Sequence, residues 1–414
     1  NMALSWVAFT PTAGYTGGGG QITITTNDQG YFGTGGPQED TDTISITVQA
    51  LGDHFDDPPD WPTFPGVLDT SFDDDGRRVL DAGNTGGSES IRAMTLLPDG
   101  KIVAAGSVDG KMALLRFTSD LDLDPNFGSG GVVKTGNAPW DSLGGSGVML
   151  EVDTEGRLLL GGGRYLYRYL ANGSLDTTFG SSGSVLHSSW PYVYGLGFQA
   201  DGQILVTSNN GIYRMDQDGG DVTSIISGGR KGLQVWDDGD IVVADNDFDV
   251  SRYSRDAVHE QTFDTDFGNS NSMLALPDNR FLVVGQTTGS GGDLVVSRHL
   301  ASGGVDTSFG TSGRTTLPVL EGDDVGYRAT LQADGKILVV GYTDTGANRD
   351  VAVARLSYDG VPDTAGFTGY ADSTVSLRIS DDLSYGDDYG YAVLHLPDGK
   401  ILVAGQSDGL IGLS

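Results

Sequence analysis

Short apolar runs separated by turn residues recur along the chain, and one arrangement of them repeats. Its clearest copy is Leu396–Gly405, where apolar residues stand on both sides of a Pro-Asp-Gly turn. Pro fixes φ, Asp bonds its own backbone and Gly accepts positive φ, so the segment predicts a β-hairpin whose second strand is almost wholly buried. Six further copies have Gly, or Asn once, at the same turn position: Gly100, Gly156, Gly202, Gly239, Asn279 and Gly335.

Two other patterns recur between the hairpins. One is an apolar strand ending in Arg, with copies at Arg116, Arg168, Arg214, Arg252, Arg298 and Arg355. The other is a Leu-Asp-x-x-Phe segment that begins at Leu68, Leu123, Leu175 and Val305, with a looser copy at Val361. This order predicts four strands per unit: A and B in the hairpin, C with the Arg, and D after the Phe. Units of roughly 40–50 residues with several short strands are typical of propeller blades. We therefore predict an all-β, seven-bladed β-propeller over residues 67–414.

The phase of the repeats predicts how the ring closes. A D strand within residues 68–80 precedes the first hairpin, and only a short C strand, 410–413, follows the last one. Two open sheet edges would remain if these ends did not meet. We expect residues 68–80 to supply the outer strand of the last blade.

The first 66 residues have a different character. Residues 1–50 alternate apolar and polar positions in three short runs, at 4–10, 21–26 and 43–48, which predict strands. Residues 51–66 are rich in Pro and Asp and predict a stiff, charged linker. Because the pattern begins in mid-course at Asn1, we expect a fragment of a longer protein.

The recurring motifs carry two family resemblances. The three patterns over 67–414, in fixed order, resemble the delta-60 repeat family of bacterial β-propellers; the fourth unit departs most, with Trp236 beside its turn. Residues 1–50 resemble the C-terminal half of a bacterial cadherin-like, immunoglobulin-like tandem repeat of surface adhesins. The resemblances imply a propeller in an extracellular setting, as part of a large adhesin, and transfer no catalytic residue.

Composition limits the partners. The formal net charge is −32, from 56 acidic and 24 basic residues, which argues against nucleic-acid binding. It fits either a secreted protein of a salty or calcium-bearing medium or simple solubility. The chain contains no Cys, so disulfides and thiolate chemistry are excluded. No apolar run approaches the roughly 20 residues of a membrane span, and no signal-peptide pattern is present.

The arginine at the end of each C strand is interpreted as structural. A residue that recurs in every unit is more often part of the scaffold than of a site. Buried Arg needs a carboxylate or carbonyl partner, so we expect it to pair with the Asp of the Leu-Asp-x-x-Phe segment.

Ligand-binding candidates come from the variable loops. The D–A and B–C connections emerge on one face of a propeller, and variable loops on a rigid scaffold are where binding residues lie. Aromatic rings beside carboxylates suit sugar stacking or capture of a peptide end; alternatively, these side chains fill the axial channel and its mouth. The candidates are Trp140, Trp190, Tyr192, Tyr194, Asp323, Asp324, Tyr327, Arg328, Asp387, Asp388 and Tyr389.

Alternating acids indicate Ca²⁺ as the one cofactor to expect, with no organic cofactor, because Ca²⁺ takes oxygen ligands from flexible loops. The first group is Asp245, Asp247 and Asp249; the second is Asp120, Asp122 and Asp124. Neither completes a known calcium loop, and chance spacing is common in so acidic a chain.

No linear catalytic motif is present: the five His are scattered, and neither a phosphate loop nor a Gly-x-Ser-x-Gly elbow occurs. We therefore predict a non-catalytic, extracellular, monomeric module of a bacterial surface adhesin that binds a cell-surface glycan or protein. The alternative is a polysaccharide-acting hydrolase or lyase with an acidic pair such as Asp323 and Asp387, since propeller active sites leave no linear motif. A purely structural spacer is the third interpretation.

Overall fold

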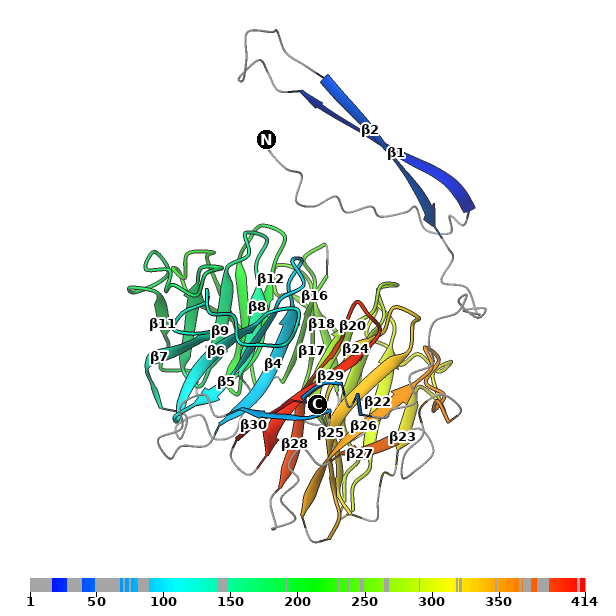
Figure 1. Ribbon diagram of the computed structural model, residues 1–414. Helices are drawn as coiled ribbons and strands as arrows, with labels where there is room; N and C mark the ends of the chain where they lie inside the picture. The colour runs from blue at the N-terminus through cyan, green and yellow to red at the C-terminus, as the bar shows by residue number, and fades with distance from the viewer. Residues whose placement is uncertain are drawn as a thin grey trace. The chain divides into compact units, whose positions relative to one another are not determined.

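The computed structural model divides the chain into two compact units, residues 1–60 and 61–414, and each is described by itself (Figure 1). The structure describes residues 17–27, 39–48 and most of 68–413. Within the last range it leaves out residues 70, 74–75, 81–88, 140–147, 191, 230, 237, 246–248, 264–267, 290, 318, 320–321, 347, 365–366, 368–373, 378–386 and 408–409.

The described part of the first unit is a two-stranded antiparallel sheet. β1 (Gly17–Asn27) pairs with β2 (Glu39–Val48), from Gly17 opposite Val48 to Asn27 opposite Glu39. Two of the three predicted strands, 21–26 and 43–48, lie within this hairpin. The third, 4–10, and the predicted linker, 51–66, lie outside the described residues. The cadherin-like module therefore stays a prediction.

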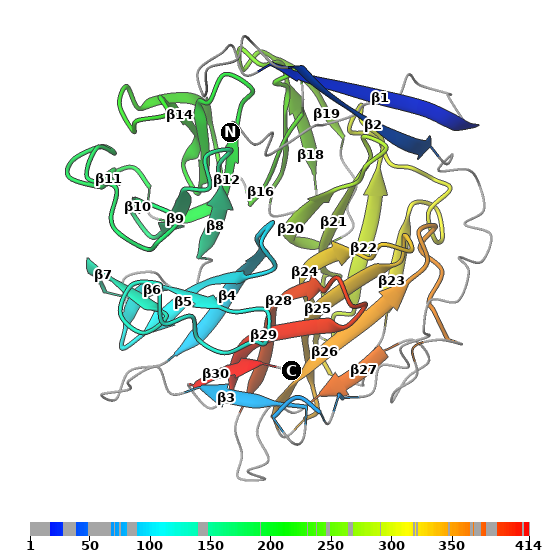
Figure 2. The same ribbon diagram turned by 45° about the horizontal axis from the view of Figure 1, so that its top comes forward.

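The second unit is a β-propeller, and the all-β prediction is confirmed (Figure 2). Its described residues form seven four-stranded antiparallel sheets. The innermost strands are β4 (Ser90–Leu96), β8 (Met149–Val152), β12 (Val193–Phe198), β16 (Gly232–Val235), β20 (Asn269–Ala275), β24 (Asp324–Leu331) and β28 (Asp388–His395). The second strands are β5 (Ile102–Val108), β9 (Leu158–Gly162), β13 (Ile204–Ser208), β17 (Ile241–Ala244), β21 (Phe281–Gln286), β25 (Ile337–Asp344) and β29 (Ile401–Ser407).

The outer half of each sheet follows the same order. The third strands are β6 (Lys111–Phe117), β10 (Tyr165–Tyr169), β14 (Gly211–Met215), β18 (Val250–Tyr253), β22 (Leu294–His299), β26 (Arg349–Leu356) and β30 (Leu410–Leu413). The outermost strands are β7 (Val132–Pro139), β11 (Ser184–Leu186), β15 (Thr223–Ser227), β19 (His259–Phe263), β23 (Arg314–Leu317), β27 (Thr374–Leu377) and β3 (Arg78–Leu80).

The two ends of the propeller meet in one sheet. β3 pairs with β30, with Arg78 opposite Leu413 and Leu80 opposite Ile411. The innermost strands contact one another in succession, and β28 contacts β4. The predicted closure by residues 68–80 is confirmed, and it gives the last sheet the outer strand that the end of the chain does not supply.

The core lies between adjacent sheets. All seven residues of β5 are buried, and the second strands are rich in Val, Ile and Leu without alternation, because a neighbouring sheet covers each of their faces. One core cluster, for example, joins Val103 and Leu114 of one sheet to Leu160 and Tyr167 of the next. Each sheet therefore depends on both neighbours for burial of its apolar side chains.

The hairpin turns have the geometry that their sequence predicts. In the first, Gly100 N–H donates to the Leu97 carbonyl at 2.9 Å, and Lys101 N–H donates to Asp99 Oδ1 at 3.2 Å. Gly100 has φ of 81°, and Asn279, which replaces Gly in the fifth hairpin, has φ of 62°. The repeated Gly or Asn therefore supplies the left-handed conformation that the tight turn needs.

Each recurrent arginine is the last residue but one of a third strand. Four of them form an ion pair with the Asp of the Leu-Asp-x-x-Phe segment or its looser copy. The Nε–Oδ2 distances are 3.0 Å for Arg116–Asp124, 2.7 Å for Arg168–Asp176, 2.8 Å for Arg298–Asp306 and 2.8 Å for Arg355–Asp363.

The other two recurrent arginines depart from the expected pairing. Arg252 contacts Asp240 and, at 3.0 Å, Glu260, while Arg214 donates to the carbonyl of Arg255. Both lie in units that lack a Leu-Asp-x-x-Phe segment after the arginine, so the usual carboxylate is missing and another acceptor takes its place.

The arginines also join neighbouring sheets. The side chain of Arg298 is 0% exposed; besides Asp306, it donates to the Tyr358 carbonyl of the next sheet at 2.5 Å and lies over the Phe309 ring, 5.0 Å from its centroid. Phe309 in turn packs on Gly360, whose φ is 78° and where a Cβ would lie 2.7 Å from the ring. The repeated Arg, Asp and Phe thus hold adjacent sheets together.

Candidate functional site: a cavity on the inner strands

Five of the innermost strands are interrupted by a β-bulge near their first residues. Pairing with the second strand skips one residue in each, and a bulge re-aims the side chain that it leaves out of the ladder. The skipped residues are Arg92, Tyr194, Asn271, Tyr327 and Tyr391. All are polar or aromatic, so the bulges present chemically active side chains at one end of the inner strands.

The strand registers align a second ring of positions. In every sheet, one inner-strand residue pairs with the fourth residue of the second strand. These residues are Ala93, Met149, Gly195, Gly232, Ser272, Arg328 and Ala392. Small side chains predominate here, and Arg328 is the one charged member of this ring.

A third ring lies two residues further along and pairs with the second residue of each second strand. It consists of Thr95, Glu151, Gly197, Gln234, Leu274, Thr330 and Leu394. Glu151 is the one charged member of this ring. The two charged residues thus stand in neighbouring rings whose other members are neutral.

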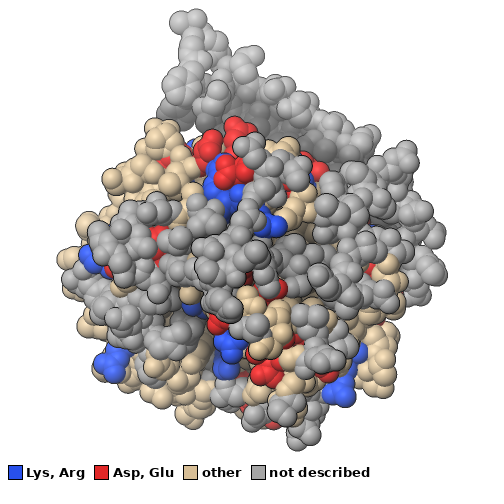
Figure 3. Space-filling view, turned by 60° about the horizontal axis from the view of Figure 1, so that its bottom comes forward, with Lys and Arg blue, Asp and Glu red and all other residues tan. Residues whose placement is uncertain are grey.

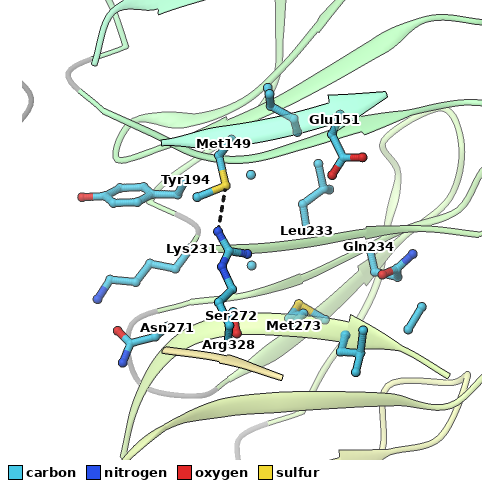
Figure 4. A pocket seen from close by; sticks show the side chains of 15 residues that line it. Met149, Glu151, Tyr194, Lys231, Leu233, Gln234, Asn271, Ser272, Met273 and Arg328 are labelled. Carbon is cyan, nitrogen blue, oxygen red and sulfur yellow. Dashed lines mark hydrogen bonds between the residues drawn. The ribbon is translucent and has the colours of Figure 1, made fainter. Parts of the chain in front are cut away.

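These charged residues share a cavity of about 360 Å³ between the inner strands (Figure 4). Arg328 crosses it from β24, and its Nη2 donates to Met149 Sδ on β8 at 3.4 Å. Glu151 points into the same space from β8. The polar side chains around them come from β12, β20, β16 and the residue before it: Tyr194, Asn271, Ser272, Gln234 and Lys231.

The surroundings disfavour the charged form of both groups. Glu151 reaches the water of the cavity but has protein around it, and this burial raises the pKa of its carboxyl to about 7, although the Arg328 charge acts to lower it. Burial likewise lowers the pKa of Arg328, opposed by the charge of Glu151. The cavity therefore holds a carboxyl that titrates near neutral pH beside a weakly partnered guanidinium.

A tyrosine cluster consists of Tyr327 on β24, Tyr342 on β25, and Tyr389 and Tyr391 on β28, in two neighbouring sheets. Tyr389 and Tyr391 stack with ring centroids 5.6 Å apart, and Tyr327 lies 5.0 Å from Tyr391. Tyr342 lies 5.3 Å from Tyr389. Burial raises the pKa of Tyr391 to about 12, so this phenol remains neutral.

Two arginines accompany the tyrosine cluster. The Arg92 guanidinium lies over the Tyr391 ring, 3.6 Å from its centroid, and Arg349 lies 4.9 Å from the centroid of Tyr342. Arg349 Nη1 also donates to the Tyr389 hydroxyl at 2.6 Å. Cation–π contacts fix the rings in place, and the result is a rigid, largely buried cluster of aromatic and cationic side chains.

The four acids predicted at this face have other contacts. Asp323 Oδ1 accepts the N–H groups of Gly291 and Gly292, at 2.8 and 3.0 Å. Asp387 Oδ1 accepts the Arg349 N–H at 2.9 Å. Each acid thus fixes a loop of the preceding sheet.

Asp324 and Asp388, next to them, are 0% and 4% exposed, and Asp324 accepts the Val319 N–H at 2.6 Å. In the pair Asp323 and Asp387, one oxygen of each acid accepts backbone N–H groups, and Asp387 Oδ2 also accepts the Tyr389 hydroxyl at 3.1 Å. A ligand role for the pair stays a prediction.

The predicted aromatic residues separate into three groups. Trp190 is 0% exposed and packs on His187 and Tyr213, with centroid distances of 4.9 and 5.7 Å, so it belongs to the core instead of an accessible face. The ring centroid of Tyr192 lies 6.2 Å from that of Tyr194, and Tyr194 lines the cavity. Trp140 lies outside the described residues.

The predicted calcium ligands are partly engaged elsewhere. Asp245 accepts the Asp249 N–H at 3.1 Å, and Asp247 lies outside the described residues. Among the described residues, no group of three His, Asp or Glu side chains is placed to hold a metal ion.

In the second predicted group, Asp120 is exposed and Asp122 lies 3.2 Å from Arg78. Asp124 is bound to Arg116 and Lys101. Calcium binding stays a prediction.

The remaining charges are interspersed rather than segregated on the face that Figure 3 shows, where described Lys and Arg side chains lie beside Asp and Glu. Within the described part of the chain, none of the elements is a helix with the length and apolarity that a membrane crossing requires.

The sequence-based candidates include Tyr194 and Arg328 of this cavity but not Glu151 or Gln234. A comparison of the seven hairpins would have identified Glu151. At the position of Glu151, the other copies have small, apolar or neutral polar residues, so an acid there stands out only when the repeats are aligned on their turns.

Comparison with known proteins agrees with this fold. Residues 97–127, 156–179 and 332–365 match a family described as "Domain of unknown function (DUF5122) beta-propeller". The matched segments and the structure together define the chain as a β-propeller. No curated protein matches its sequence. The delta-60 resemblance itself stays a prediction.

Solved structures with a similar fold include proteins of several kinds. Virginiamycin B lyase from Staphylococcus aureus, in a catalytically inactive form with quinupristin, is 13% identical, with a TM-score of 0.54 over 81% of this chain and 98% of that chain. The WD40 propeller domain of Doa1 is 16% identical, with a TM-score of 0.51 over 81% and 95%. The Neurospora crassa Pan2 WD40 domain is 11% identical, with a TM-score of 0.51 over 78% and 88%. At these identities the likeness concerns the fold alone.

Proposed function

We propose that this propeller is a non-catalytic binding module whose ligand enters the inner-strand cavity and contacts Tyr194 in its wall. The observation that carries the proposal is the gathering of Arg328, Glu151, Tyr194 and the neutral polar residues in one cavity. Concave sites with a few convergent polar groups and perturbed pKa values are typical ligand sites.

A glycan suits this surface. Tyrosine rings stack on the apolar faces of sugars, and the side chains of Asn271, Gln234 and Ser272 match sugar hydroxyls as donors and acceptors. An extracellular surface protein of a bacterium, of which this chain is one module, is the setting in which such binding would act as adhesion. The motif resemblances over 1–50 and 67–414 support that setting.

Glycan binding is tested with an array of bacterial and algal glycans, using the full chain with and without added Ca²⁺. We expect selective binding that Tyr194→Ala weakens at least about tenfold, because Tyr194 lines the cavity and stacking on one aromatic ring contributes roughly 1–3 kcal/mol. Tyr253→Ala, on the outer part of another sheet, is the matched control and retains binding. Absence of binding under both conditions contradicts the proposal.

A second candidate is a hydrolase or lyase that uses Glu151 as its general acid. The observation that favours it is the pKa of about 7 for that carboxyl, since a group that titrates near the working pH is suited to proton transfer. Glu151 replaces the pair Asp323 and Asp387 in this candidate, because backbone groups hold both aspartates. Turnover of any array-positive glycan, lost in Glu151→Gln, would establish it.

A further inference from the structure

Arg328 has far fewer partners than other enclosed arginines of the propeller. A guanidinium has five N–H donors. In the described part of the chain, the hydrogen bond that Arg328 donates goes to a thioether, Met149 Sδ, which is a weak acceptor. By contrast, Arg298 has a carboxylate, a carbonyl and a hydroxyl as acceptors. Enclosing a charge without an oxygen acceptor is costly unless a ligand or water supplies one.

The position of Arg328 is informative because the chain as a whole is strongly acidic. The chain carries a net charge of −32, yet two cationic side chains, Arg328 and Lys231, line the cavity. The other six positions in the ring of Arg328 are neutral, so no repeat of the scaffold requires an arginine there. An anionic group that entered the cavity would find a preorganised planar donor, and planar guanidinium binds carboxylates in bidentate fashion.

Glu151 supplies the complementary group. It faces the cavity on β8, and the charged or titratable groups that line the cavity with it are Arg328 on β24, Tyr194 on β12 and Lys231 before β16. When protonated, its carboxyl can donate a hydrogen bond to a second carboxyl; when ionised, it repels one. The two charged residues can therefore hold a carboxylate between them only while Glu151 retains its proton.

We propose that the cavity binds the carboxylate of a uronic acid at the end of a glycan, with Arg328 as its charge partner and Glu151 as a proton-sharing partner. The volume of about 360 Å³ lies near the lower end of ligand pockets, which favours one terminal sugar over a stretch of polymer. The Tyr194 ring and the amide side chains of Asn271 and Gln234, which line the cavity, favour a sugar over a peptide end. This inference rests on the proposed function and names its ligand class.

The experiment is a calorimetric and NMR titration of the full chain with D-glucuronate, D-glucose, acetate, and a tripeptide with a free C-terminus, at pH 6 and pH 8. At pH 6 we expect glucuronate to bind at least about tenfold more tightly than glucose, because a bidentate, charge-assisted contact adds to the stacking. Acetate is expected to compete weakly. Glucuronate affinity is expected to fall about tenfold at pH 8, as Glu151 ionises.

Variants separate the roles of the two residues. Arg328→Met is expected to abolish the preference for glucuronate while glucose still binds, and Arg328→Lys is expected to restore it in part. Glu151→Gln should remove the fall between pH 6 and pH 8. Arg255→Met is the matched control, because its side chain is 47% exposed and pairs with Asp201 in another part of the fold; it should bind like the unaltered chain.

The outcomes distinguish the two proposals. Equal affinities for glucose and glucuronate, or a preference that survives in Arg328→Met, overturn the uronic-acid inference and leave glycan binding intact. Binding of the tripeptide but neither sugar overturns the sugar class. Binding of none of these compounds, together with a negative glycan array, overturns both proposals. Circular dichroism of each variant shows whether the fold is retained.

Discussion

Arg298 and Arg328 lie in two regions of one propeller and differ in their contacts. Arg298 lies near the end of the third strand β22 and is fully buried. Asp306 is 2.8 Å away, the Tyr358 carbonyl of the next sheet 2.5 Å away, and the guanidinium lies over the Phe309 ring. Arg328 lies on an innermost strand and donates to a thioether. The first arginine has counterparts in other sheets, and the second has none at its aligned position.

This difference separates scaffold from site. A cluster that recurs from sheet to sheet stabilises the contact between neighbours, and its polar groups are satisfied within the protein. A charged residue that occurs once among seven equivalent positions is not needed for that contact. In a repeat protein, the exceptions to the repeat are therefore the better guide to binding.

The largest effect is expected from Arg298→Met. The change leaves the buried carboxylate of Asp306 with Arg280, 2.9 Å away, as its remaining cationic partner and removes the bond to the Tyr358 carbonyl. Loss of one partner of a buried ion pair costs about 3 kcal/mol or more of unfolding free energy. Urea denaturation followed by circular dichroism measures it.

Arg328→Met is the matched control for that variant. It removes a poorly partnered charge and fills its place with an apolar side chain, so we expect a change within about 1 kcal/mol, or a gain in stability. Equal losses in the two variants would show that the distinction between scaffold and site is wrong.

A smaller effect is expected from Gly360→Ala, which tests the contact between sheets. Gly360 has φ of 78°, and a Cβ would lie 2.7 Å from the Phe309 ring of the preceding sheet. Gly346 has nearly the same φ, 80°, but open space around it. Backbone strain alone costs about 1–2 kcal/mol, so Gly346→Ala should lose that amount and Gly360→Ala about 1–3 kcal/mol more. If thermal melts show equal losses, Phe309 does not hold the two sheets together at this point.

The smallest effect is expected from Glu151→Gln, and it depends on pH. The pKa of Glu151 rises from 4.5 to about 7 on folding. The group is protonated in both states below pH 4.5; between 4.5 and 7 the unfolded chain releases a proton that the folded chain keeps. Its contribution to stability is therefore present at low pH and lost as pH rises through about 7.

The variant Glu151→Gln cannot ionise at this position, so it does not lose stability as the pH rises through about 7. Because water reaches Glu151, the gain is expected to stay below about 1 kcal/mol. We expect Glu151→Gln to match the unaltered chain at pH 4 and to be more stable at pH 8, as measured by urea denaturation at both values. A difference of the same size at both pH values would contradict the raised pKa.

Much of the scaffold could be predicted from local patterns. The turns at Gly100 and Asn279 follow from residues that accept positive φ, and the closing role of residues 68–80 follows from the order of the motifs. The pairing of Arg with the Asp of the next segment is a local relation of eight residues, and the structure shows it in four sheets. The two arginines without that segment have other partners, and the absent motif signals this departure.

The candidate site could be predicted only in part. Tyr194 and Arg328 were found because they lie in a variable region, and Trp190 was misplaced because an aromatic residue in a loop can equally complete the core. Asp323 and Asp387, the acidic pair of the alternative enzyme interpretation, each accept backbone N–H groups of the preceding sheet. Such contacts join residues about 30–40 positions apart and leave no local pattern.

The sequence by itself determined the repeating unit, its strand order and the way the ring closes, because turn geometry, strand burial and motif order depend on neighbouring residues. Only the tertiary structure decided that Met149 and Arg328, 179 positions apart, meet across one cavity that also holds Glu151. The physical reason is that the inner strands are brought together by packing of whole sheets. Which side chains face one another there depends on the register and bulges of several strands at once.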